Sequence, residues 1–181
     1  MIKKQSKMVV YAAILIIISY VWFIACALEL SLFSMLRFVL LIAFSYTAML
    51  FDLRQKRIPN TLVLGMFGGW LLLIIPKLYL DSQAGIWLLA DSMLGLLLGG
   101  GVFLAVYLVS RKGLGGGDVK FMAAAGLYLG FSKTIPAILY GTILAALVGL
   151  ILIAFKRIKR KDTMPLAPFL FVGIMITVFT S

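Results

Sequence analysis

The fold of this chain depends on one short apolar stretch, DVKFMAAAGLYLGFS at residues 118–132. The stretch is about 15 residues long, whereas a helix that spans a membrane usually needs roughly 17 or more. If the stretch crosses, every later residue lies on the opposite side of the bilayer from where it would otherwise lie. The stretch also begins in an unusual way, because Asp118 follows three consecutive glycines.

The composition is typical of a protein that resides in a lipid bilayer. Of the 181 residues, 64% are hydrophobic, and the mean hydropathy is +1.15. A soluble domain is about 45–50% apolar, so we expect an all-α, polytopic membrane protein with a single domain over residues 1–181. The first apolar run is long enough to cross and no A-x-A-like site follows it, so a cleaved signal peptide is not expected. Apolar runs predict spans at about 8–28, 34–51, 61–80, 86–109, 118–132, 134–155 and 164–181.

The distribution of basic residues decides whether the short stretch crosses, because cytoplasmic loops carry an excess of Lys and Arg. With about seven spans and a cytoplasmic N-terminus, all of the 17 basic residues except Arg37, Lys77 and Lys133 lie inside. Without the crossing, the KRIKRK cluster at 156–161 moves outside and most of this asymmetry disappears. The charge pattern therefore favours seven spans.

The composition also argues against several kinds of site. The chain has one cysteine, Cys26, and no histidine, so we expect no disulfide, no metal site, no cofactor and no His-activated nucleophile. The net charge of +11 would suggest nucleic acid in a soluble protein. Here the basic residues flank apolar runs, where they orient the protein and can hold anionic headgroups. We therefore predict membrane lipids, and not nucleic acid, as partners.

Two of the six acidic residues stand out by their positions. Asp52 ends the second predicted span and Asp118 begins the fifth, so that both lie at the cytoplasmic rim of the bilayer. Carboxylates at this depth are costly unless they are paired or face a wet cavity, so they are functional candidates. The other four have ordinary explanations: Glu29, Asp81 and Asp162 fall in predicted loops, and Asp91 could reach the interface or pair with Lys77.

Each of the two acids also has a structural explanation. Asp118 could cap the helix that follows the glycines, and Asp52 could pair with Arg54 or Arg57 at the interface. These explanations are reasonable for either acid alone, but they do not account for two such acids at the same depth.

Two neighbouring motifs are explained by helix geometry. In the RIPN segment, Pro59 predicts the end of one helix, and Asn60 can cap the next. In GLLLGGG, Gly95 and Gly99 form a small-xxx-small surface that predicts close packing against another helix.

Together the two acids predict a proteolytic site. If two carboxyl groups approach within a few ångström, they cannot both ionise, and they share one proton. One then activates a water molecule while the other polarises the scissile carbonyl, as in aspartic proteases. Gly115, Gly116 and Gly117 would let an extended substrate backbone lie beside Asp118, because glycine has no side chain and accepts positive φ. Lys120 would bind the substrate backbone or keep Asp118 ionised, although snorkelling from a helix end is its simplest role.

These motifs resemble those of the type IV prepilin peptidases, which are GxGD-type membrane aspartic proteases. An acid precedes RIPN, GGGDVK fits a GxGDxK pattern, and MPLAPFLFVG follows later, so the resemblance runs from about Phe51 to Gly173. It implies removal of the basic leader from prepilin-like precursors of type IV pilus or secretion systems. It also implies a plasma or inner membrane location, with the active site facing the cytoplasm. The catalytic residues would be Asp52 and Asp118, with Gly115, Gly117 and Lys120 as the other motif residues.

The chain departs from the larger members of that group, which carry a zinc domain with paired CxxC motifs and methylate the new N-terminus. The resemblance therefore implies peptidase activity and leaves methylation open. Three alternatives remain: an archaeal preflagellin peptidase of the same family, a small proton-coupled transporter that uses both acids as a relay, and a non-enzymatic assembly protein. The sequence does not predict the oligomeric state.

Overall fold

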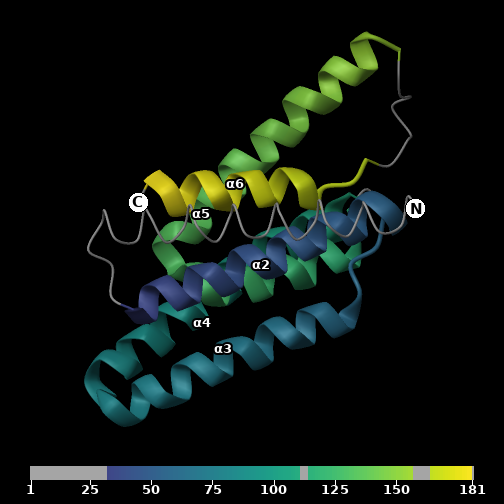
Figure 1. Ribbon diagram of the computed structural model, residues 1–181. Coiled ribbons are helices and arrows are strands. Elements are labelled where there is room, and N and C mark those ends of the chain that lie inside the picture. Colours follow the sequence, from purple (N-terminus) through teal and green to yellow (C-terminus); the bar gives the residue numbers. More distant parts are fainter. Residues whose placement is uncertain (1–31, 111–113, 157–163, 181) are drawn as a thin grey trace.

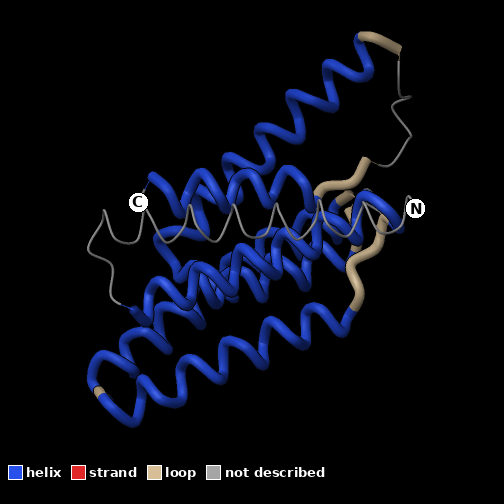
Figure 2. Tube along the Cα trace, in the orientation of Figure 1, coloured by secondary structure: helices blue, strands red, loops and turns tan. Residues whose placement is uncertain are grey.

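The computed structural model describes residues 32–110, 114–156 and 164–180, and the regular structure in these ranges is entirely helical (Figure 1, Figure 2). The predicted all-α class is therefore confirmed for the described residues. The span predicted at 8–28 lies outside them. The helices are α2 (Leu32–Gln55), α3 (Asn60–Leu80), α4 (Ser82–Val109), α5 (Gly116–Ala154) and α6 (Ala167–Thr180).

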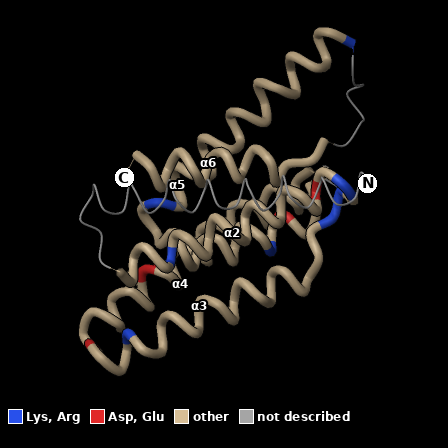
Figure 3. The backbone as a smooth tube through the Cα atoms, in the orientation of Figure 1, with Lys and Arg blue, Asp and Glu red and all other residues tan. Residues whose placement is uncertain are grey.

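The described helices have the length and composition of membrane spans. Helices α2, α3, α4 and α5 are each long and apolar enough to cross a bilayer. Helix α6 is a shorter apolar helix of 14 residues. The described charged residues gather toward the two ends of the bundle, with apolar residues between them (Figure 3). These features indicate an integral membrane protein.

Helix α5 consists of two helical segments joined at a break. Gly130 has φ 73° and ψ −179°, a conformation that is essentially restricted to glycine. The hydrogen-bonding groups freed at the break are satisfied, because Phe131 N–H donates to Asp91 Oδ1 (3.0 Å) and Thr134 Oγ1 donates to the Gly130 carbonyl (2.6 Å). Beyond the break, the chain turns back toward the side on which α5 began (Figure 1). The two segments correspond to the fifth and sixth predicted spans.

Glycines let α4 and α5 approach at very short range. Gly95 of α4 contacts the backbone of Gly126 in α5, and a Cβ at either position would overlap the other glycine's carbonyl oxygen. A Cβ at Gly99 would lie 2.5 Å from the Met122 carbonyl oxygen. Small residues allow such backbone contact between membrane helices, and the packing role predicted for Gly95 and Gly99 is confirmed.

The first segment of α5 lies at the centre of the core. Phe121, Met122, Leu127 and Tyr128 are fully buried within it. Tyr128 Oη also donates a hydrogen bond of 2.6 Å to the carbonyl of Met66 in α3. The segment that carries Asp118 is therefore held by contacts along its length.

The connection between α2 and α3 brings the RIPN segment to one end of the bundle. Helix α2 ends at Gln55, and Lys56, with φ 50°, donates its N–H to the Asp52 carbonyl at 2.8 Å. Pro59 occupies the N-cap position of α3, so the predicted break in the helix there is confirmed. Asn60 is the first helical residue and not the cap, so its predicted capping role is wrong.

Candidate active site

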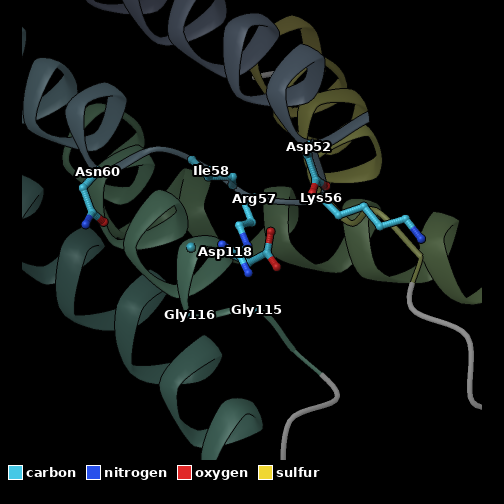
Figure 4. Close-up of a pocket in the computed structure, with 9 residues that line it drawn as sticks. Asp52, Lys56, Arg57, Ile58, Asn60, Gly115, Gly116 and Asp118 are labelled. Atoms are coloured by element: carbon cyan, nitrogen blue, oxygen red, sulfur yellow. The ribbon is translucent and has the colours of Figure 1, made fainter. Parts of the chain in front are cut away.

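Asp52 and Asp118 line one cavity of about 360 Å³ at the end of the bundle (Figure 4). Asp52 comes from the last turn of α2, and Asp118 comes from the first turn of α5. The two carboxylates are close enough for their charges to repel each other. The structure therefore brings together the two acids that the sequence pattern singles out. The cavity is also lined by Lys56, Arg57, Ile58, Asn60, Gly115, Gly116 and Gly117.

Asp52 is fixed by the start of α6. It is only 5% exposed, and its Oδ2 accepts a hydrogen bond of 2.9 Å from Ala167 N–H. Ala167 is the first residue of α6, so the carboxylate meets the positive end of the helix dipole. Among the described residues, no ion pair joins Asp52 to Arg54 or Arg57, and the interfacial pairing considered from the sequence is not formed.

Asp118 lies in the first turn of α5 without capping it. The N-cap residue is Gly115, and no side-chain hydrogen bond caps the helix. Asp118 Oδ1 is buried and has no hydrogen-bond partner in the described part of the chain. A buried oxygen without a donor costs free energy, and such exceptions are often found at functional sites. Asp118 is therefore not the N-cap residue of this helix, as one explanation from the sequence had it.

The three glycines differ in what surrounds them. A Cβ at Gly115 would lie 2.9 Å from Asp118 Oδ2, and a Cβ at Gly117 would lie 3.2 Å from the Ile58 Cβ. A Cβ at Gly116 would meet nothing within 4 Å. Gly130 is the one described glycine with positive φ, so the glycines beside Asp118 provide space and not an unusual backbone conformation. The absence of side chains predicted from the sequence therefore applies to these glycines, whereas the positive φ does not.

Lys120 lies next to the cavity and does not line it. Its Nζ donates a hydrogen bond of 3.0 Å to Asn60 Oδ1, and Asn60 is a cavity residue. The pair ties the first turn of α5 to the first turn of α3, beside the contact between Gly117 and Ile58. A direct contact between Lys120 and substrate stays a prediction.

The start of α6 and the α2–α3 connection are parts of the site that the residue types alone did not identify. A backbone amide such as Ala167 N–H carries no sequence signature, and the only local signal is the pair of prolines in MPLAP. The pairing of Asp91 with Lys77 considered from the sequence is not formed, because Lys77 pairs with Asp81 at 3.6 Å while Asp91 accepts from Phe131 N–H. The described residues contain no cluster of three His, Cys, Asp or Glu side chains, and the absence of a metal site stays a prediction.

The chain is similar to known proteins over most of its described length. Residues 38–150 match the sequence model of the type IV leader peptidase family. This region contains both Asp52 and Asp118, and it ends before α6. No solved structure matches the chain.

Among the relatives named prepilin leader peptidase/N-methyltransferase, three show the range of similarity. The protein of Escherichia coli (strain K12) is 33% identical over 141 residues, which cover 74% of this chain and 58% of that protein. The protein of Legionella pneumophila is 28% identical over 159 residues, covering 87% of this chain and 53% of the relative. The protein of Bacillus subtilis (strain 168) is 32% identical over 90 residues, covering 48% and 36%. The chain therefore spans about half the length of the curated relatives it matches.

Proposed function

Because the chain belongs to the type IV leader peptidase family, we propose that it is an aspartic endopeptidase that removes the leader peptide of prepilin-like precursors. The observation that carries the proposal is the shared cavity of Asp52 and Asp118. The names of the relatives support the choice of substrate. The proposal covers the peptidase step and does not extend to methylation.

The chemistry follows from the two carboxyl groups. At short range they share one proton, so one is a base and the other an acid. The base takes a proton from a water molecule, whose oxygen adds to the scissile carbonyl carbon, while the acid donates a hydrogen bond to the carbonyl oxygen. The proton then passes to the leaving nitrogen as the carbon–nitrogen bond breaks. Ala167 N–H would keep Asp52 in one orientation through these steps.

The glycines and the basic residues would receive the substrate. The open space at Gly116 and the bare backbones of Gly115 and Gly117 support the entry of an extended peptide next to Asp118. Since peptide groups need donors and acceptors when buried, the backbone of this segment would pair with the cleavage-site backbone. Lys120 would join these contacts from the adjacent turn.

The proposed topology has seven spans, a cytoplasmic N-terminus and one membrane domain over residues 1–181. In this proposal α2, α3, α4, the two segments of α5 and α6 would form six of the spans, and the apolar run at 8–28 would form the seventh. Basic residues are concentrated near Asp52 and Asp118, the proposed catalytic dyad. This concentration supports a cytoplasmic active site, in the plasma or inner membrane.

The proposal is tested by co-expressing the chain with candidate precursors and following loss of the leader by gel shift and N-terminal sequencing. Asp52→Asn and Asp118→Asn should each lower the cleavage rate by about 10³-fold or more, because each removes one member of the acid–base pair. Asp81→Asn is the matched control. Asp81 caps α4 by accepting from Ala84 N–H at 3.1 Å, and asparagine caps as well as aspartate, so cleavage should be unchanged.

Cleavage that survives either substitution at the dyad would remove that acid from the mechanism. Failure of the inserted wild-type protein to cleave any precursor would contradict the proposed activity. Gradient-driven proton flux in liposomes would then favour the transporter alternative, since a peptidase should show no such flux.

A further inference from the structure

A second charged cluster lies away from the dyad, where α2, α4 and the second segment of α5 meet. It consists of Arg37, Asp91 and Lys133, which the proposed reaction does not use. Arg37 is near the start of α2, whereas Asp52 is near its end. Lys133 lies just past the break in α5, whereas Asp118 lies at its beginning. The two clusters are therefore at opposite ends of the bundle.

Arg37 is the unusual member of this cluster because it is buried and its Nε lacks a hydrogen-bond partner among the described residues. The residue is only 9% exposed, and its Nε has no hydrogen-bond partner in the described part of the chain. Its guanidinium instead lies over the ring of Phe38, 5.1 Å from the centroid. A buried guanidinium without a hydrogen-bonded counter-charge is strongly unfavourable.

Lys133 adds a second positive charge at the same place. Its Nζ lies over the same Phe38 ring, 4.7 Å from the centroid, and the charge of Arg37 acts on it. Two cations that share one aromatic ring repel each other, and a cation–π contact with a phenylalanine ring is only a modest attraction. The pair is therefore not balanced by the ring alone.

Asp91 does not neutralise this pair. Its Oδ1 already accepts from Phe131 N–H at the break in α5, and its other oxygen lies against Gly130. The charge of Asp91 does act on Arg37, but within the described ranges the one ion pair shorter than 4 Å is that of Lys77 with Asp81. Two cations and one engaged carboxylate leave the cluster with an excess positive charge.

We propose that Arg37 and Lys133 bind the phosphate group of an anionic phospholipid at this end of the bundle. Arginine presents a fork of donors that suits phosphate oxygens, and lysine binds phosphate as a point charge. Both residues lie near the ends of apolar helical segments, where the proposed topology places the lipid headgroups. Basic pockets between membrane helices bind anionic headgroups in this way. The lipid phosphate supplies the counter-charge that the described residues do not.

The site is tested with the purified full chain in detergent by measuring the rise in thermal unfolding temperature as a function of lipid concentration. Phosphatidylglycerol should stabilise the wild-type protein, whereas phosphatidylcholine and inorganic phosphate should do so much less. Arg37→Gln and Lys133→Gln should each weaken the apparent affinity for phosphatidylglycerol by about fivefold or more, as expected for loss of one basic contact. Native mass spectrometry should show the same loss of bound lipid.

Two controls keep the test specific. Lys77→Gln removes a basic residue that already pairs with Asp81, so its lipid dependence should match that of the wild type. Arg37→Lys keeps the charge and should retain most of the effect, even if Arg37→Gln folds poorly. Lys133→Gln then gives an independent reading, because this side chain is only half-buried.

Four outcomes would overturn the proposal. Equal stabilisation by phosphatidylglycerol and phosphatidylcholine would exclude recognition of an anionic headgroup. Equal stabilisation by inorganic phosphate would identify a free anion, and not a lipid, as the ligand. An equal loss in Lys77→Gln would show that binding follows net charge, and unchanged affinity in Lys133→Gln would remove that residue from the site. None of these measurements depends on cleavage, so they stand apart from the proposed peptidase activity.

Discussion

At the scale of single residues, the GGGD segment shows why two of its glycines are constrained while the one between them is not. Gly115 lies against the Asp118 carboxylate, and Gly117 lies against Ile58, which follows the end of α2. Gly116 faces open space within the cavity. The alternation of constrained and unconstrained positions gives a physical reason for a G-x-G-D pattern.

Alanine substitutions in this segment should separate positioning from substrate access. Gly115→Ala would push its Cβ against Asp118 Oδ2, so we expect kcat to fall about 100-fold, as small misplacements of catalytic groups can cause. Gly116→Ala should leave kcat near the wild-type value and raise KM, because its Cβ occupies only space meant for the peptide. Steady-state cleavage of a synthetic precursor peptide measures both. An equal kcat for the two variants would contradict the assignment of positioning to Gly115 and substrate access to Gly116.

The two acids that line the cavity could be singled out from the sequence because an acid at the end of an apolar run is rare and costly. Their surroundings could not be predicted in the same way. The donor to Asp52 is a backbone amide 115 positions away, and Asn60 caps nothing because its side chain accepts from Lys120. Both outcomes depend on contacts between helices, which local sequence preferences do not encode.

At the scale of helices, the crossing of α4 and α5 decides where Asp118 is held. The contact between Gly95 and Gly126 brings the two backbones together, and the first segment of α5 is packed into the core on this basis. The pattern of small residues predicted close helix packing at Gly95 and Gly99, since a spacing of four places them on one helix face, but it did not predict which helix packs there.

A larger side chain at the α4–α5 crossing should destabilise the protein, whereas the same change elsewhere in α4 should not. Gly95→Ala would place a methyl group against the Gly126 carbonyl, and overpacking of this kind costs about 1–3 kcal/mol. Gly101→Ala in the same helix meets nothing within 4 Å and should be neutral or stabilising by up to about 1 kcal/mol, because alanine favours helix. Thermal unfolding in detergent compares the two. A melting temperature in Gly95→Ala as high as in Gly101→Ala would show that the helices can separate without cost.

The break in α5 could be located only approximately from the sequence. The short stretch at 118–132 left open whether one or two segments are present, and basic residues, not local propensity, favoured two. In the structure, the break falls at Gly130 because its φ suits glycine and because Asp91 of α4 receives the freed Phe131 N–H. The second cause is a long-range contact and has no local signature.

At the scale of the whole molecule, the proposed orientation can be tested with single cysteines. In a Cys26→Ser background, Gln55→Cys marks the dyad end and Ser82→Cys marks the connection between α3 and α4, and both positions are exposed. An impermeant maleimide on intact bacterial cells should label Ser82→Cys and leave Gln55→Cys unlabelled, because basic residues concentrate near the dyad. Permeabilised cells provide the control, in which both should react. The reverse pattern in intact cells would place the dyad outside.

The hydrogen bond from Ala167 to Asp52 has a consequence for synthesis of the protein. Ribosomes synthesise the chain from its N-terminus. Both aspartates are therefore made, and can enter the membrane, before α6 exists. A nascent chain that has reached Ala154 therefore holds the two acids without the donor that fixes one of them. The finished geometry arises only when the final described helix is inserted. The order of translation thus delays the final arrangement of the proposed site until α6 has been made.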